Sequence, residues 1–266
     1  MNNESFSRGV LYSKQSQDNY VLTRVQPSGE FAHVVETYWH VTWSLDQNKP
    51  HTQQNIPDPC INMVFERGNS RLVGAVTKRY SANLVGEGSI FGVKFRAGGF
   101  HLLCNSSVSE FTDASISIAH FFGDKSHELV DQVLNSAQDT EHAINIIEDF
   151  LRPFLPSTFD SVYQIDEILK EVKANSSITK VKQLLGAFNI SERGLQRLFK
   201  THVGVSPKWV IRKFRMQEVL ARLECGETDW QSLIEHLDYF DQSHFIRDFK
   251  SLVGVSPSDY VERLNA

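Results

Sequence analysis

A nine-residue segment that recurs fifty positions later constrains the fold of this chain more than any other feature. The sequence is Phe-Lys-Thr-His-Val-Gly-Val-Ser-Pro over residues 199–207 and Phe-Lys-Ser-Leu-Val-Gly-Val-Ser-Pro over residues 249–257. The alignment continues on both sides, where Leu195 matches Phe245 and Val210 matches Tyr260. A repeat of this kind marks a repeated structural unit, so the C-terminal part is predicted to hold two copies of one helical unit.

Each copy of the repeat encodes the end of one helix and the start of the next. Gly204 and Gly254 suit the left-handed conformation that ends a helix, because glycine has no Cβ to clash there. Ser206 and Ser256 follow two positions later and can accept hydrogen bonds from the free N–H groups of a new helix. The proline after each serine fits the first helical position, where no N–H is needed.

The residues before the first copy predict a helix-turn-helix. Leu195, Leu198 and Phe199 form an inward stripe at helical spacing, which leaves polar side chains on the outside. The sequence supplies the other signals of the motif: a Ser177 cap before apolar positions from Ile178, a turn at Asn189 and a Ser191 cap. Two helices joined by a tight turn, the second with outward Arg and Gln, are typical of DNA-binding units.

Charge is distributed unevenly along the chain. The net charge is −5, which taken alone argues against nucleic acid as a partner. Residues 178–215, however, hold nine basic residues against one acidic residue, while residues 216–266 hold four against ten. A compact basic block of this kind is typical of a surface that contacts phosphates, although many charge runs are only solvated helix faces.

The first half of the chain predicts strands followed by a helical pair. Alternating residues over 35–43, and shorter runs over 61–65 and 91–95, have the period of half-buried strands. After Gly123 the apolar spacing becomes helical over 126–135 and 141–151. The predicted fold is therefore α+β: a β-rich barrel or sandwich with a helical pair, then an all-α domain of two helix-turn-helix units. The predicted domains are 1–156 and 157–266, with units at about 160–206 and 207–266.

Several function classes are disfavoured by composition and motifs. The apolar runs are too short to span a membrane, and the N-terminus lacks the pattern of a secretory signal, so a cytoplasmic location is expected. Cys60, Cys104 and Cys225 form neither a disulfide framework nor a metal motif, and the last two are expected in the core. We expect no catalytic residues, no metal and no cofactor.

Residues 160–266 resemble the DNA-binding domain of the AraC/XylS family. The resemblance rests on Ser-Glu-Arg-Gly-Leu-Gln-Arg-Leu-Phe-Lys over 191–200, on both Gly-Val-Ser-Pro segments, and on Asp-Gln-Ser-His-Phe-Ile-Arg-Asp-Phe-Lys over 241–250. It implies two helix-turn-helix units joined by a long helix. Residues 30–155 are more weakly similar to the cupin-like N-terminal domains of that family, through Trp39, the stretch from Ile56 and the segment 92–99.

The resemblance implies which side chains contact DNA. In the first unit the expected base contacts are Arg193, Gln196 and Arg197, whose side chains suit guanine and adenine edges. Phosphate contacts are expected from Lys200, Lys208, Arg212 and Lys213. In the second unit the reading face is expected to comprise Gln242, Ser243, His244, Arg247 and Lys250.

The second unit departs from the family pattern in ways that predict weaker docking. Leu185 and Asn189 in the first unit, and Ile234 and Asp238 in the second, stand where the family has Ala and Gly. Phe240 stands where a polar cap is usual, so the start of the last recognition helix is expected to be less well defined. Together with the acidic balance of 216–266, this predicts that the second unit contributes less to DNA affinity.

The sequence thus predicts a transcription regulator that reads two successive major grooves and is controlled through its N-terminal domain. Double-stranded DNA is the expected partner, and a small-molecule effector, RNA polymerase and a second copy of the chain are further candidates. Candidate ligand-binding residues are Tyr38, His40 and Arg96, with Glu36 on the same face, which alternation places opposite the core. The alternative is a cupin-like ligand-binding protein or enzyme whose helical domain mediates assembly.

Overall fold

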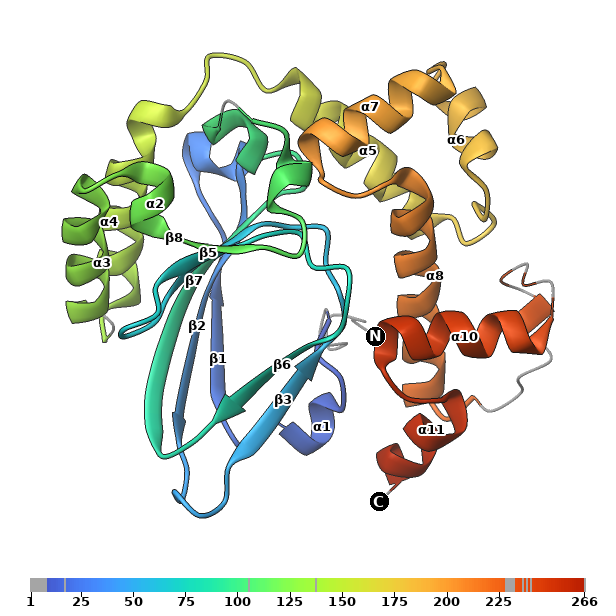
Figure 1. Cartoon of the computed structure of the whole chain (residues 1–266), viewed down its shortest axis with the longest axis horizontal. Helices are drawn as coiled ribbons and strands as arrows, with labels where there is room; N and C mark the ends of the chain where they lie inside the picture. Colours follow the sequence, from blue (N-terminus) through green and yellow to red (C-terminus); the bar gives the residue numbers. More distant parts are fainter. Residues whose placement is uncertain are drawn as a thin grey trace.

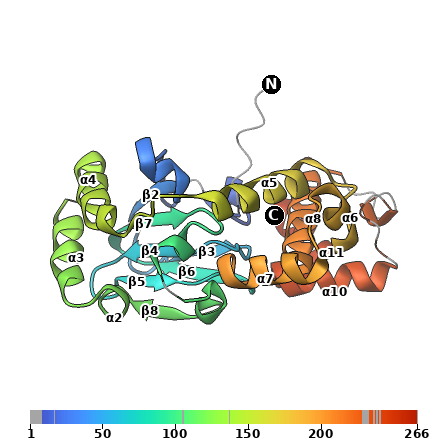
Figure 2. The ribbon, with the colours of Figure 1, turned by 90° about the horizontal axis from the view of Figure 1, so that it is seen from above.

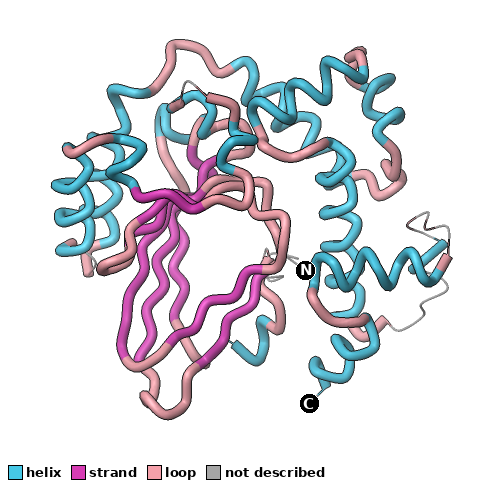
Figure 3. The backbone as a smooth tube through the Cα atoms, viewed as in Figure 1, coloured by secondary structure: helices cyan, strands magenta, loops and turns pink. Residues whose placement is uncertain are grey.

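A computed structural model gives the structure of the chain and describes residues 9–16, 18–104, 106–136, 138–227, 233–235, 237, 239 and 241–265. The chain forms a β-rich N-terminal part and a helical C-terminal part, which lie side by side (Figure 1). Strands dominate only the first part, as the coloured trace shows (Figure 3). The predicted α+β class is therefore confirmed.

Two antiparallel sheets build the N-terminal part. The larger sheet has six strands in the spatial order β1-β2-β7-β4-β5-β8, and β3 pairs with β6 in a separate two-stranded sheet. Their bounds are β1 Val21–Val25, β2 Val35–Ser44, β3 His51–Asn55, β4 Asn62–Phe65, β5 Arg71–Val73, β6 Tyr80–Leu84, β7 Glu87–Phe95 and β8 Ser115–Ser117. Short 3-10 helices lie at η1 Gly29–His33, η2 Phe100–Leu103, η3 Val108–Phe111 and η4 Arg152–Phe154.

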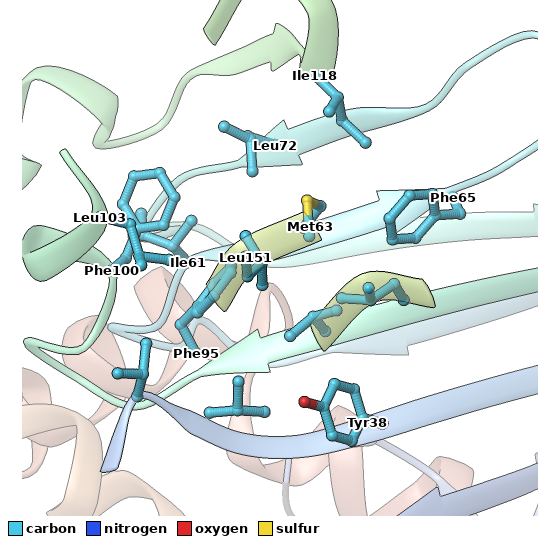
Figure 4. Close-up of a cluster of buried hydrophobic side chains, with 14 of the residues drawn as sticks. Tyr38, Ile61, Met63, Phe65, Leu72, Phe95, Phe100, Leu103, Ile118 and Leu151 are labelled. Atoms are coloured by element: carbon cyan, nitrogen blue, oxygen red, sulfur yellow. The ribbon is translucent and has the colours of Figure 1, made fainter. Parts of the chain in front are cut away.

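Three helices cover one face of the six-stranded sheet: α2 Ile118–Phe122, α3 Lys125–Asn135 and α4 Thr140–Leu151. Their apolar stripes, which include Leu129, Val133 and Ile147, are buried against the strands. Tyr38, Met63 and Phe95 lie in the same cluster (Figure 4). The helical pair predicted over 126–135 and 141–151 is confirmed, and its apolar faces build the domain core.

The C-terminal part is entirely helical in the residues described. Its elements are α5 Asp160–Ala174, α6 Val181–Ala187, α7 Glu192–His202, α8 Pro207–Glu224, α10 Gln242–Val253 and α11 Pro257–Asn265. A single turn of helix, α1 Ser13–Ser16, precedes β1 and lies beside this part. Among the helices of the described ranges, none is both long and apolar enough to cross a membrane.

The repeat has the structure that its residues predict. Gly204 and Gly254 take φ values of 87° and 88°, in the left-handed region. The hydroxyl of Ser206 accepts a hydrogen bond from the N–H of Trp209, and that of Ser256 accepts one from Asp259. Both copies therefore end one helix and cap the next, as predicted.

The turn of the first unit follows the prediction, but the start of its first helix does not. Asn189 has a φ of 46°, as its tolerance of left-handed backbone predicts. The helix expected from Ile178 begins at Val181, and Lys180 is its N-cap. Ser177 instead hydrogen bonds to the Asn175 side chain, because Asn forms a local turn with the backbone two residues on.

The two parts share hydrophobic clusters. Cys60, Ala75 and Ala97 of the β-rich part are buried together with residues of α5, α7 and α8. Leu11 and Ile56 are buried with residues of α8, α10 and α11. The N-terminal part therefore packs against both helix-turn-helix units. Of the other cysteines, Cys104 is half-buried and Cys225 is exposed at the end of α8, so the core position expected for Cys225 was wrong.

Candidate nucleic-acid interface and cavity

Helix α7 presents a polar face that its cap and its apolar stripe orient. The hydroxyl of Ser191 accepts a hydrogen bond from the N–H of Gly194, which fixes the start of the helix. Leu195 and Phe199 are fully buried on the inner side. The four predicted DNA-contacting side chains of this helix are all exposed: Arg193, Gln196, Arg197 and Lys200.

Helix α10 repeats this arrangement in the second unit. Asp241 is its N-cap, and the carboxylate accepts a hydrogen bond from the N–H of His244 at 2.7 Å. Phe245 and Phe249 are buried, as their equivalents are in α7. The five predicted contact residues are exposed: Gln242, Ser243, His244, Arg247 and Lys250.

The cap at Asp241 corrects the expectation that this helix starts poorly. That expectation placed the cap at Phe240, which together with Asp238 lies outside the described residues. The register differs by one position, and an aspartate is among the best N-cap residues. Ile234 is described and packs against the cluster of the second unit, so the larger side chain is accommodated.

Two side chains of α10 are engaged within the protein. The His244 ring packs against Tyr239, with centroids 5.2 Å apart, and its Nε2 lies 3.8 Å from the Asp248 carboxylate. The Nε of Arg247 donates to the carbonyl of Ser243 on the same helix. Arg247 must therefore give up this internal hydrogen bond before its Nε can contact a base.

The four predicted phosphate-contacting residues differ in exposure. Lys200 and Lys208 are exposed. Arg212 is half-buried, and its guanidinium donates to the Ser251 hydroxyl at 2.6 Å. Lys213 is only 5% exposed and pairs with Asp58 of the β-rich part, so its expected phosphate contact was wrong. Helical spacing places residue 213 on the buried face of α8, and the distribution of charge along the sequence does not reveal which face a residue occupies.

Helix α8 separates α7 and α10, the two reading helices, whose exposed faces are expected to contact bases. Figure 2 shows α7 and α10 on the same side of α8. The helix has 18 residues, which corresponds to about 27 Å at 1.5 Å per residue. That length is close to the ~34 Å of one DNA turn, the distance between successive major-groove segments on one face.

The N-terminal part contains a partly open cavity of about 310 Å³ that both sheets line. The sheet register orders its wall into rows. Arg24, Trp39 and Gly92 lie opposite one another across β1, β2 and β7. A neighbouring row is apolar and contains Leu22, Val41 and Ile90, whereas the row on the other side contains Lys94 and Asn62. The cavity is therefore apolar along one row, while the middle row ends in Arg24 and Arg71 and the row on the other side holds Lys94.

A β-bulge decides which side chains of β2 face this cavity. The register shifts between Val35 and Thr37, so that Glu36, Thr37 and Trp39 all line the cavity wall. A one-residue shift exchanges the faces of every later position on the strand. Strict alternation from Val35, which sequence reasoning used, therefore assigns the positions after the bulge to the wrong face.

The structure corrects the expectation that Tyr38, His40 and Arg96 line a ligand cavity. The Tyr38 hydroxyl donates to the Glu148 carboxylate on α4, and burial raises the tyrosine pKa. His40 lies beside Phe91 on the core face and shares a hydrogen bond with Ser89, and burial lowers its pKa. Arg96 donates to the Ala32 carbonyl and pairs with Asp166 of α5.

Lys94 lies in a compact group of ionised side chains in the cavity wall. The Nζ of Lys94 lies 2.6 Å from the Asp58 carboxylate and 3.2 Å from the Glu36 carboxylate. Burial alone lowers the pKa of Lys94, but the two carboxylates outweigh it and raise that pKa. Burial alone raises the pKa of Asp58, but Lys213 and Lys94 hold it well below its usual value. Burial and Asp58 raise the pKa of the Cys60 thiol, which disfavours the reactive thiolate.

Of these residues, sequence reasoning found only Glu36, although one signal pointed to Asp58. Asp58 stands between two prolines, where an acidic side chain is held in a restricted backbone. In the part of the chain that the structure describes, no group of three or more His, Cys, Asp and Glu side chains is arranged to hold a metal ion.

Comparison with known proteins gives two family matches. Residues 23–117 match a family described as a domain of unknown function (DUF6597), and residues 184–263 match a family described as a helix-turn-helix domain. The raffinose operon transcriptional regulatory protein RafR of Pediococcus pentosaceus is 34% identical over 80 residues, which are 30% of this chain and 29% of that protein. The XylDLEGF operon transcriptional activator 1 of Pseudomonas putida is 32% identical over 109 residues, which are 40% and 31%.

The aligned residues thus span about a third of the length of these relatives. Among solved structures, ToxT from Vibrio cholerae aligns with 93% of this chain and 100% of its own at 14% identity, with a TM-score of 0.38. The helix-turn-helix match over 184–263 contains both copies of the repeat and both exposed reading helices. The chain therefore contains a helix-turn-helix domain over residues 184–263, the part in which it resembles the AraC/XylS family.

Proposed function

We propose that the chain is a sequence-specific DNA-binding transcription regulator that reads two successive major-groove segments through α7 and α10. One observation carries this proposal: two capped helices expose polar faces on the same side of a single joining helix. The transcriptional regulators RafR and XylDLEGF activator 1, which match part of the chain, support the same function. Because DNA is the partner, we place the protein in the cytoplasm.

Each reading helix supplies side chains that distinguish bases. A guanidinium such as that of Arg193 or Arg197 donates two parallel hydrogen bonds to guanine O6 and N7. The amides of Gln196 and Gln242 match the donor and acceptor pattern of adenine. Lys200 of α7 and Lys208 at the start of α8 are exposed and are suited to phosphate contacts, which position the protein without reading sequence.

The N-terminal cavity is proposed to bind the effector. Its size fits a small organic molecule, and it combines an apolar wall with a few polar groups, as ligand sites commonly do. This lining favours an occupant with an apolar body and a polar end, the latter toward Glu36, Asp58 and Lys94. We propose no catalytic role for the chain.

The cavity is also the observation that favours the alternative function, a ligand-binding protein or enzyme whose helical part mediates assembly.

A second copy of the chain and RNA polymerase stay among the proposed partners on the resemblance alone. The apolar stripes of α3 and α4 are buried against the sheet and do not supply a dimer contact. Sedimentation of the full chain at micromolar concentration tests the dimer, and a monomer there contradicts it.

Selection of randomised duplex DNA by the full-length protein, followed by sequencing, tests the proposed function. A regulator enriches one motif with two parts about one helical turn apart. Arg197→Ala should relax one base position in the first part, and Arg247→Ala one in the second. Lys170→Ala, an exposed residue of α5, is the matched control and should leave the motif unchanged. If no motif is enriched, the alternative function is favoured.

A further inference from the structure

A five-residue segment, 56–60, connects the cavity to the whole DNA-binding domain. Ile56, Asp58 and Cys60 all line the cavity. Ile56 is also buried in the cluster of the second unit, and Cys60 in the cluster of the first unit. The segment therefore contacts the cavity on one side and both helix-turn-helix units on the other.

The backbone of this segment is stiff. Pro57 and Pro59 are both buried, and each fixes its own φ. Pro59 also restricts Asp58 to extended conformations, because its ring clashes with a helical residue before it. The N–H of Val76 donates to the Asp58 carbonyl and anchors the centre of the segment. A displacement of the Asp58 side chain therefore moves the whole segment, because the backbone cannot adjust locally.

The carboxylate of Asp58 lies between two lysines from different domains. One oxygen is 2.6 Å from Nζ of Lys94 in the cavity wall, and the other is 3.8 Å from Nζ of Lys213 on α8. The Lys94 pair is the tighter of the two. The lysine of α8 is buried, and burial lowers its pKa, while Asp58 of the β-rich part is the main group that offsets this effect.

We propose that Asp58 couples occupancy of the cavity to the position of α8, by dividing its charge between Lys94 and Lys213. The inference rests on the proposed effector site. An occupant whose polar end pairs with Lys94 leaves Asp58 free to hold Lys213 more tightly, so α8 stays docked. An occupant that takes the Asp58 carboxylate leaves Lys213 buried without its partner, and α8 loosens, because an uncompensated buried charge is strongly unfavourable.

Amide hydrogen exchange of α8 in the full-length protein tests this coupling without a ligand or DNA. Asp58→Asn and Lys213→Met each remove one side of the inter-domain pair. We expect each to accelerate exchange in the middle of α8 at least tenfold. The double variant should exchange no faster than the faster single variant, because neither partner is then left charged and alone.

A substitution in the cavity wall alone should act in the opposite direction. Lys94 belongs to β7, and Lys94→Met removes the competitor of Lys213 for Asp58. Exchange in α8 should then slow at least threefold. Glu218→Gln is the matched control: it neutralises a carboxylate in the Glu218–Arg222 pair within α8 and should change exchange less than twofold.

Two results overturn the proposal. One is that the folded Asp58→Asn and Lys213→Met variants exchange like the control, and the other is that Lys94→Met fails to slow exchange. Asp58 and Lys213 lie on opposite sides of the interface, so failure of one variant to fold leaves the other to decide. Exchange is independent of DNA, so a protein that selects no DNA motif but shows these effects contradicts the proposed function and leaves the coupling intact.

Discussion

His101 and His202 face each other across the boundary between the two parts of the chain, with ring centroids 4.1 Å apart and ring planes at 63°. His101 belongs to η2 and His202 is the last residue of α7. Beside them, the Ser107 hydroxyl donates to the Lys200 carbonyl and the Thr112 hydroxyl donates to the Gly204 carbonyl. The end of the first reading helix is therefore fixed against the β-rich part.

This histidine pair makes the boundary sensitive to acid. Burial lowers the pKa of His202, and the nearby His101 lowers it further. The undocked ring has an ordinary pKa of about 6.5 and therefore binds a proton more readily than the docked ring. The stabilising contribution is thus present above about pH 6.5 and is lost as the pH falls below it. We expect the protection of the amides over 198–204, relative to their intrinsic exchange rates, to fall as the pH is lowered from about 6.5 to 5.5.

His202→Gln separates this effect from general acid unfolding. The glutamine cannot be protonated, so the loss of protection over 198–204 should be reduced, while the protection of the other helices should match that of the wild type at each pH. His127→Gln, on α3 far from the boundary, is the control. An unaltered pH profile in His202→Gln would show that another group carries the acid sensitivity.

The two caps of the reading helices should contribute equally to stability. Ser191→Ala and Asp241→Ala each remove a side chain that accepts a hydrogen bond in the first turn. Loss of such a cap costs about 0.5–2 kcal/mol. Urea unfolding of both variants measures it. If Asp241→Ala leaves the free energy of unfolding unchanged while Ser191→Ala lowers it by the expected amount, the Asp241 cap does not stabilise the start of α10.

The helical half was largely predictable because its signals are local. The glycines, serines and prolines of the repeat act on the residues next to them, so their conformations followed from sequence. Exposure of Arg193, Arg197 and Arg247 followed from the apolar stripe of each helix. The role of Lys213 could not be predicted in this way, since its partner Asp58 is distant in the chain and nothing local indicates the pair.

The β-rich half was less predictable because a single β-bulge changes which face of the strand each position of the alternating pattern occupies. Alternation gave the strands correctly, but the shift after Val35 moved Tyr38 and His40 to the core face. The cavity is assembled from both sheets, and the charged group in its wall joins Glu36, Asp58 and Lys94 from separate segments. Pairing of distant strands decides such a site, and one sequence carries no direct signal of it.

The two reading units should contribute unequally to DNA affinity. Residues 178–215 carry nine basic residues and one acidic residue, against four and ten in 216–266. Phosphate neutralisation sets much of the affinity for DNA, and Arg247 is also engaged with its own helix. Arg197→Ala should cost about 1–3 kcal/mol of binding free energy, and Arg247→Ala less. Titrations of both variants on the selected DNA at one salt concentration decide it, and equal losses contradict the ranking.

The wall of the cavity should be disrupted by one added methyl group at Gly92. The Trp39 indole lies over this glycine, so that a Cβ there would approach two of its ring carbons to 2.1 Å. The Trp39 Nε1 also donates to the Asn62 side chain, and a displaced ring loses that bond. Overpacking of this kind costs about 1–3 kcal/mol, so Gly92→Ala should lower the urea midpoint and shift the tryptophan emission. Gly186→Ala is the control, since nothing lies within 4 Å of its Cβ and alanine stabilises a helix interior by about 0.5–1 kcal/mol. If Gly92→Ala is as stable as the wild type, the Trp39 indole does not pack rigidly over residue 92.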